Sequence, residues 1–129
     1  MLKTGITGEA RCLVTPETTA ANLGSGALEV FAPPAMIALI EKAAWQSVQP
    51  LLEEGCGTVG TALRVRHLSA TPVGMEVVAK TELREIDGRR LVFKVEVHDA
   101  KGIVGDGEHE RFIVKNDSFL KKAKGKLGE

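Results

Sequence analysis

The segment "VFAPPAMIALIEKAAWQSVQPLLEEG", residues 30–55, decides the fold that this sequence predicts. Its apolar residues recur close to the 3.6-residue period of an α-helix, at positions 36, 37, 40, 44, 48, 51 and 52. Pro33 and Pro34 suit a helix start, because the first N–H groups of a helix have no partner inside it. Pro50 should kink or end the helix, and Gly55 suits a stop. We therefore predict a helix from about residue 34 to about residue 53.

After this helix the apolar period changes to two, which is the period of a β-strand. In the first run one face carries residues 59, 61, 63, 65 and 67, and the other face carries Arg64 and Arg66. The second and third runs place residues 77, 79, 81 and 83, and then 91, 93, 95 and 97, on one face. Turns are expected at "SATPVG" (69–74), "DG" (87–88) and "KG" (101–102), and residues 108–115 form the last strand. The pattern predicts a four-stranded antiparallel meander, with "ARCLV" (10–14) as an edge strand and residues 16–29 as a loop.

The helix is apolar over much of its circumference, through Met36, Ile37, Leu39, Ile40, Ala43, Ala44 and Trp45. A helix of this kind is buried on most sides, so we expect the sheet to wrap around it. The sequence therefore predicts an α+β fold, a single hotdog domain with an antiparallel sheet wrapped around one long central helix. We place the domain at residues 1–118 and expect the basic segment 119–129 to be a flexible tail. Open sheet edges favour a homodimer that covers them.

Length and composition exclude several classes of protein. The 129 residues fit one domain. The 17 basic residues balance the 17 acidic ones, so the chain has no excess of positive charge that would indicate binding to nucleic acid. No stretch approaches the roughly 20 apolar residues of a membrane span, and the N-terminus lacks the apolar core of a signal peptide. Cys12 and Cys56 form no paired-cysteine motif, which fits a reducing cytoplasm. The three scattered histidines have no metal-ligand spacing, so we expect no metal site. We expect no separate cofactor either.

The segment "GCGTVG", residues 55–60, matches the phosphate-binding fingerprint G-x-G-x-x-G. That fingerprint requires a strand before it and a helix after it, and here the order is reversed. The three glycines are therefore expected to be a helix stop, a loop residue and a strand residue. Gly60, inside the strand, is expected where a ligand or another backbone approaches closely.

Glu41 and His67 are the candidate catalytic residues. Glu41 has apolar neighbours one helical turn away, and burial there would raise its pKa and suit a general base or nucleophile. The simpler interpretation is a glutamate at the edge of the apolar face that pairs with Lys42 or solvent. His67 lies on the inward strand face, either as a hydrogen-bonded core residue or as an acid–base partner of Glu41.

The remaining two histidines fall on later strands. His98 is expected at the surface. His109 shares a face of the last strand with Arg111, and we expect that face to be solvated.

Three segments together resemble the fluoroacetyl-CoA thioesterase-like family of single-hotdog proteins. They are "VFAPPAMIALIEKAA" (30–44), "GTVGTALRVRHLSATPVG" (57–74) and "DGRRLVFKVEVHDAKGIVGDGEHERFIV" (87–114), in the order and spacing of that family. The resemblance implies a homodimer that binds acyl-CoA and hydrolyses its thioester. It implies catalytic roles for Glu41 and His67. It also implies that the Gly60 N–H faces the thioester carbonyl and that Arg111 lies near the substrate.

One position departs from that family. The family has a catalytic threonine just before the helix, and the spacing from Glu41 places Pro33 there, in the substrate site but without a hydroxyl or an N–H. Residues 22–30 contain no aromatic side chain that could close a small acyl pocket, which argues against specificity for fluoroacetyl groups.

We expect an enzyme, an acyl-CoA thioesterase that acts on short or medium acyl chains. The alternative is a non-catalytic acyl-CoA-binding protein, favoured by Pro33. A hydratase lacks its Asp–His pair here, and a transcription regulator lacks a DNA-binding segment.

Overall fold

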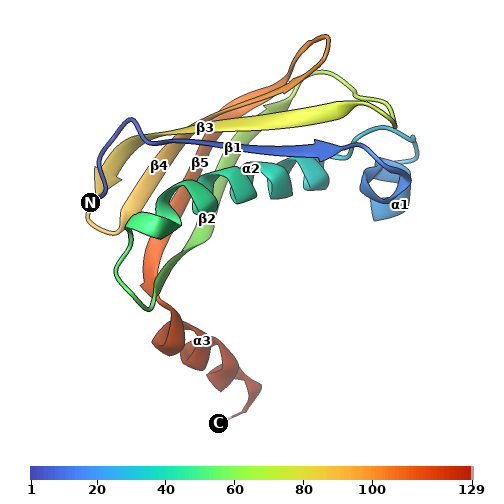
Figure 1. Ribbon diagram of the computed structural model, residues 1–129. Helices are drawn as coiled ribbons and strands as arrows, with labels where there is room; N and C mark the ends of the chain where they lie inside the picture. Colours follow the sequence, from blue (N-terminus) through green and yellow to red (C-terminus); the bar gives the residue numbers. More distant parts are fainter. Residues whose placement is uncertain (129) are drawn as a thin grey trace.

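The computed structural model describes residues 1–128, and Figure 1 shows one curved sheet lying over one long helix. Within these residues the five strands are β1 (Thr7–Leu13), β2 (Cys56–His67), β3 (Glu76–Asp87), β4 (Arg90–Asp99) and β5 (Gly102–Lys115). The α-helices are α1 (Ala20–Leu23), α2 (Pro33–Val48) and α3 (Asn116–Lys124). Short 3₁₀ turns are η1 (Pro16–Thr18), η2 (Gln49–Leu51) and η3 (Gly125–Leu127).

The central helix α2 begins where the prolines predicted but ends earlier than expected. Pro33 and Pro34 occupy its first two positions after the N-cap residue Ala32. The predicted end near residue 53 is wrong, because α2 stops at Val48 and a 3₁₀ turn follows. Pro50 lies inside that turn, and its missing N–H explains why the α-helical ladder does not continue.

The sheet is antiparallel with the strand order β1-β3-β4-β5-β2. The predicted meander is therefore wrong in part, since β3, β4 and β5 are sequential neighbours but β2 pairs with β5. The eight residues between β2 and β3 reach about 26 Å, enough to cross the roughly 14 Å over β5 and β4. The two outermost strands of the sheet are β1 and β2. The prediction that the first strand lies at an edge of the sheet is therefore confirmed.

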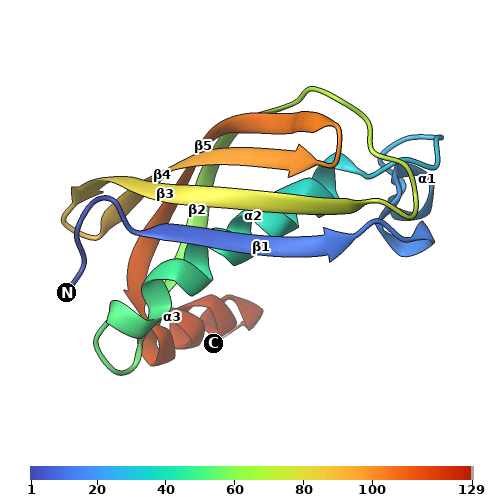
Figure 2. The same cartoon turned by 45° about the horizontal axis from the view of Figure 1, so that its top comes forward.

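The core lies between α2 and the inner face of the sheet, where Figure 2 shows β1 and β3 side by side along the helix. The strand alternation of β3 and β4 is confirmed, because residues 77, 79, 81, 83, 91, 93, 95 and 97 are all buried. The helix is less enclosed than expected: Trp45 is 40% exposed, and Pro34 and Ala38 also face solvent. One side of α2 is thus uncovered in a single chain.

Two further segments contain more structure than the sequence indicated. Residues 16–29, expected to be a loop, contain η1 and α1, and the Thr19 side chain caps α1 by accepting from the Asn22 N–H. Residues 119–127 of the expected tail belong to α3 and η3, which extend away from the sheet with exposed side chains (Figure 1). The flexibility of this segment and the boundary at residue 118 stay predictions. None of the helices within residues 1–128 is both long enough and apolar enough to cross a membrane.

Candidate functional site

Glu41, Gly60 and Arg111 lie together, where the middle of α2 meets β2 and β5. An Arg111 Nη1–H donates to Glu41 Oε2 at 3.4 Å, and Gly60 is the cross-strand partner of Arg111. A Cβ built on Gly60 would lie 2.5 Å from Glu41 Oε2, so the expected close approach at this glycine is made by the Glu41 side chain. The sequence placed these three residues in one site through a resemblance, and the structure brings them into contact.

A β-bulge in β2 decides which side chains enter this cluster. The register with β5 shifts between Gly60 and Ala62, and Thr61 is the extra residue. A bulge reverses the alternation of faces, because one additional residue is inserted. The expectation that Thr61 shares the inward face of His67 is therefore wrong: Thr61 is exposed, and its hydroxyl donates to Glu110 Oε2 at 2.6 Å.

Thr58 takes an inward position on the other side of the bulge. Its hydroxyl oxygen accepts from Arg111 Nε at 2.8 Å, and its carbonyl oxygen accepts from Arg111 Nη2 at 2.9 Å. The strand pattern does not single out Thr58, because its position depends on the bulge. Gly57 lies one residue before it, inside β2 rather than in the predicted loop.

His109 and Arg111 are buried, and the expectation of a solvated strand face is wrong. Their exposed fractions are 0% and 5%, because this face of β5 packs toward α2 and the Phe93 ring stacks on His109. An Arg111 Nη1–H donates to His109 Nε2 at 3.1 Å, and His109 Nδ1–H donates to the Ala62 carbonyl at 3.0 Å. Ile113, partly buried at the next position of this face, was the signal that could have predicted the burial.

Burial also lowers the pKa values of two basic side chains in this cluster. It lowers the pKa of His109, and the nearby Arg111 charge acts in the same direction. Burial likewise lowers the pKa of Arg111, although the Glu41 carboxylate opposes the effect. Glu41 itself is 38% exposed on its side chain, so its expected burial is wrong for a single chain.

His67 and Pro33 lie in a second region, at the N-terminal end of α2. Both line an open hollow of about 300 Å³, together with Ala20, Val30, Phe31, Leu68, Ser69 and Ala70. The hollow is held together by the backbone, since the Phe31 N–H donates to the Thr71 carbonyl at 2.9 Å. The walls are mostly apolar, as a site for an acyl chain requires.

The His67 ring has one unused nitrogen. Its Nε2 is buried and has no hydrogen-bond partner among the residues that the structure describes, and its ring meets the Phe31 ring edge-on at 6.3 Å. Burial lowers the pKa of His67, while a hydrogen bond with the Ser69 backbone opposes the shift. A neutral imidazole with a free nitrogen can accept or deliver a proton.

The two regions do not meet within one chain. Pro33 and Glu41 are about 12 Å apart along α2, and Gly60 and His67 are roughly 20 Å apart along β2. Within residues 1–128 neither a hydrogen bond nor an ion pair joins Glu41 to His67. The pairing considered from the sequence is therefore not made inside a single chain.

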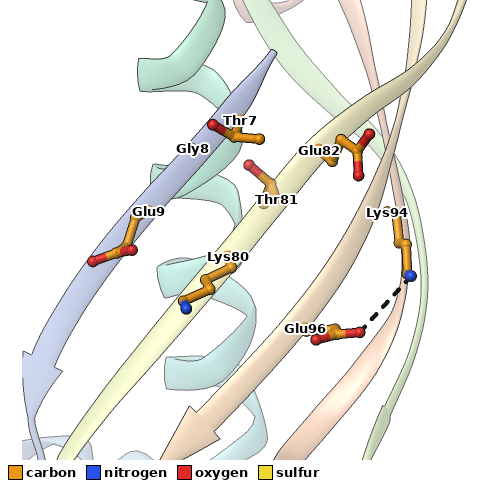
Figure 3. Close-up of a pocket in the computed structure, with 8 residues that line it drawn as sticks. All are labelled: Thr7, Gly8, Glu9, Lys80, Thr81, Glu82, Lys94 and Glu96. Atoms are coloured by element: carbon orange, nitrogen blue, oxygen red, sulfur yellow. Dashed lines mark ion pairs between the residues drawn. The ribbon is translucent and has the colours of Figure 1, made fainter. Parts of the chain in front are cut away.

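A larger hollow of about 460 Å³ lies elsewhere, on β1, β3 and β4 (Figure 3). Charged side chains of both signs line it, and Lys94 pairs with Glu96 at 3.8 Å. It contains none of the candidate residues. Among residues 1–128, no cluster of three histidine, cysteine, aspartate or glutamate side chains could hold a metal ion.

Comparisons with known proteins agree with the resemblance seen in the sequence. The family model described as fluoroacetyl-CoA-specific thioesterase matches residues 14–117. The fluoroacetyl-CoA thioesterase of Streptantibioticus cattleyicolor is 42% identical over 98 residues, which are 76% of this chain and 70% of that protein.

Solved structures extend the agreement to the whole fold. A structure of the fluoroacetyl-CoA thioesterase FlK matches with a TM-score of 0.91 and 35% identity over 98% of each chain. A thioesterase superfamily member from Thermus thermophilus matches with a TM-score of 0.88 and 26% identity, over 98% of this chain and 96% of that one. A hot-dog-like protein from Thermanaerovibrio acidaminovorans, 23% identical over 99% of this chain and 95% of its own, shares the fold with a TM-score of 0.89. The predicted hotdog fold is confirmed.

Proposed function

Because this chain belongs to the fluoroacetyl-CoA-specific thioesterase family, we propose that it hydrolyses the thioester of a short or medium acyl-CoA. One observation supports this most strongly: a carboxylate, a buried guanidinium and a backbone glycine converge at Glu41, Arg111 and Gly60. The cluster opens to solvent at Gly60, which is exposed. A thioester carbonyl at this opening would meet a base and a backbone N–H donor together.

These groups supply what the hydrolysis of a thioester requires. The Glu41 carboxylate takes a proton from water, and the water oxygen forms a bond to the thioester carbon. The Gly60 N–H donates to the oxyanion, an interaction worth a few kcal/mol in the barrier. The C–S bond then breaks, and the thiolate of CoA takes up a proton.

In the second form of the mechanism, Glu41 attacks the carbonyl itself and water hydrolyses the mixed anhydride. In either form, the contact with Arg111 holds the Glu41 side chain beside Gly60.

A complete site in this proposal needs a second copy of the chain. No strand within residues 1–128 pairs with the outer edge of β2, and the same strand carries Gly60 and His67. If two copies pair antiparallel through β2 about an axis at Arg64, and Thr61 is the extra residue of the bulge, His67 of the second copy lies opposite Gly60, about 5 Å away. Residues directly opposite in an antiparallel pair point to the same face, so this His67 would point toward Glu41.

The uncovered face of α2 favours the same assembly. Trp45, one turn after Glu41, and Ala38, one turn before it, are exposed in one chain. A second copy would bury this apolar face together with the strand edge. The homodimer therefore gives each site Glu41 from one copy, and His67 and Pro33 from the other.

The first experiment measures release of free CoA thiol from a panel of acyl-CoAs. Glu41→Gln should lower kcat by about a hundredfold, as loss of a general base does, with acyl-CoA binding retained. Glu108→Gln is the matched control, because this carboxylate is on the outer face of β5 and 56% exposed. Equal rates for Glu41→Gln and the wild type would remove Glu41 from the mechanism.

The composite site has its own test. Glu41→Gln and His67→Ala chains, coexpressed with two affinity tags and purified as the mixed dimer, should recover about half of the wild-type activity, since one of the two symmetric sites is then intact. Each variant alone should stay inactive. A mixed dimer as inactive as its parents would show that both residues act from one chain.

A non-catalytic acyl-CoA-binding protein is the second candidate function. Pro33 favours it, because proline cannot supply the hydroxyl that the family places at this position. Calorimetry separates the two candidates: acyl-CoA binding without thiol release on any chain length would make this a binding protein.

A further inference from the structure

His109 is a buried, hydrogen-bonded histidine for which the proposed reaction has no role. Its side chain is 0% exposed and lies between the Phe93 ring and the Arg111 guanidinium. It stands on β5 two residues before Arg111, on the same inward face. A histidine in such a place needs partners for both ring nitrogens, and it has them.

The partners determine the protonation state of His109. An arginine side chain has only N–H donors, so the contact between Arg111 Nη1 and His109 Nε2 at 3.1 Å requires Nε2 to accept. The ring proton must then lie on Nδ1, where it is donated to the Ala62 carbonyl at 3.0 Å. Both contacts exist together only in the neutral ring.

Arg111 is consequently held along two sides. Thr58 accepts from Nε at 2.8 Å and from Nη2 at 2.9 Å, and His109 accepts from Nη1. The contact to Glu41, at 3.4 Å, is the longest of the set, and the Glu41 side chain is 38% exposed. Four donors of the guanidinium are thus used, and its plane is fixed by Thr58 and His109 rather than by Glu41.

We propose that His109 is a positioning residue, which holds Arg111 at the point where its guanidinium keeps the Glu41 carboxylate directed toward Gly60. This inference rests on the proposed role of Glu41 in hydrolysis. Proton uptake by His109 would remove the acceptor for Nη1 and place a second positive charge beside Arg111. A neutral His109 therefore holds Arg111 in place, and a protonated His109 releases it.

The charged groups around His109 agree with a neutral ring. Arg111 faces it from β5 and disfavours the imidazolium, whereas Glu41 from α2 and Glu110 from β5 favour it. Burial outweighs both carboxylates and lowers the pKa of His109. At neutral pH the ring is therefore the acceptor that Arg111 needs.

Two substitutions separate positioning from mere packing. His109→Gln offers an amide oxygen to Arg111 and does not titrate, whereas His109→Leu fills similar space without an acceptor. We expect His109→Leu to lower kcat by up to about a hundredfold, with KM nearly unchanged, since a catalytic group misplaced by 1 Å loses about that much. His109→Gln should restore most of kcat and should remove the part of the acid-side decline in the kcat–pH profile that belongs to His109.

A second readout needs no turnover. Long-range ¹H–¹⁵N spectra of the substrate-free wild type should show His109 as the neutral Nδ1–H tautomer at pH 7, assigned by its loss in His109→Gln. Arg111 should show slowed exchange of its guanidinium protons in the wild type and in His109→Gln, but not in His109→Leu.

Several results would overturn the inference. One is a His109 ring found as the Nε2–H tautomer or as an imidazolium at pH 7. Another is an exchange rate of the Arg111 guanidinium protons that is the same in His109→Leu as in the wild type. The third is a His109→Leu protein with the kcat of the wild type. A wild type that hydrolyses no acyl-CoA would instead refute the proposed function, and the spectra would still decide whether His109 holds Arg111.

Discussion

The prediction that follows most directly from the structure concerns Gly60→Ala. A Cβ at this position would lie 2.5 Å from Glu41 Oε2, 3.2 Å from His109 Cε1 and 3.4 Å from Arg111 Nη1. An ordinary carbon–oxygen contact is longer by roughly 1 Å, so the Glu41 carboxylate has to withdraw by about that distance. Because a misplacement of 1 Å costs about a hundredfold in rate, kcat should fall by about a hundredfold.

The same substitution should leave the fold intact. The atom nearest to the new methyl group is the end of a flexible side chain, and the backbone of Gly60 is not in the left-handed region. The unfolding temperature should change much less than the rate, because the restriction of the unfolded chain by alanine offsets part of the weakened contact between Glu41 and Arg111. Thermal unfolding and thiol release, measured on the same samples, therefore distinguish a lost rate from a lost fold.

Gly57→Ala is the matched control, because it lies on the same strand and its Cβ would meet only the end of the Asn116 side chain, at 2.7 Å. It should keep the kcat of the wild type. A Gly60→Ala protein with wild-type kcat would refute the reasoning, since it would show that Glu41 can move without loss of rate.

Two further predictions concern Pro33 and pH. Pro33→Thr should raise kcat if a hydroxyl here assists Glu41 and His67, as measured by thiol release, and an unchanged rate would show that this protein orients water without it. Stability should fall as pH drops below about 6.5, because burial lowers the pKa of His109 and the unfolded chain then binds a proton that the folded chain does not. The slope from this residue is at most about 1.4 kcal/mol per pH unit, and His109→Gln should remove it in denaturant unfolding at a series of pH values. Equal slopes in the two proteins would mean that His109 titrates alike in the folded and unfolded states.

The sequence predicted those parts of the fold that depend on local periodicity. The start of α2 at Pro33 and the buried faces of β3 and β4 are confirmed, because prolines and alternating apolar residues act on neighbouring positions. The position of β2 beside β5 was missed, since a connection of eight residues leaves the choice of neighbour open. Strand order is a property of long-range packing, which turn residues alone do not determine.

Some residues of the candidate site were likewise predicted from the sequence, and others were not. Glu41, Gly60 and Arg111 were chosen through a family resemblance, and they lie in contact. Thr58 was missed because one extra residue, Thr61, changes the face on which it lies. His109 was misjudged because a charged neighbour such as Arg111 suggests solvent, although here the two side chains satisfy each other inside the protein.

The separation between the two regions bears on how such a protein diversifies. The groups proposed for hydrolysis come from α2 and from paired strands, where each position is constrained by several neighbours. The walls around His67 come mainly from two segments that flank α2 and β2, residues 20–31 and 68–70, and residues 68–70 are exposed to solvent. Mutations in those segments can enlarge, shrink or close the proposed acyl pocket while Glu41 keeps its place. A lineage with this architecture can therefore change its acyl preference without having to rebuild its chemistry.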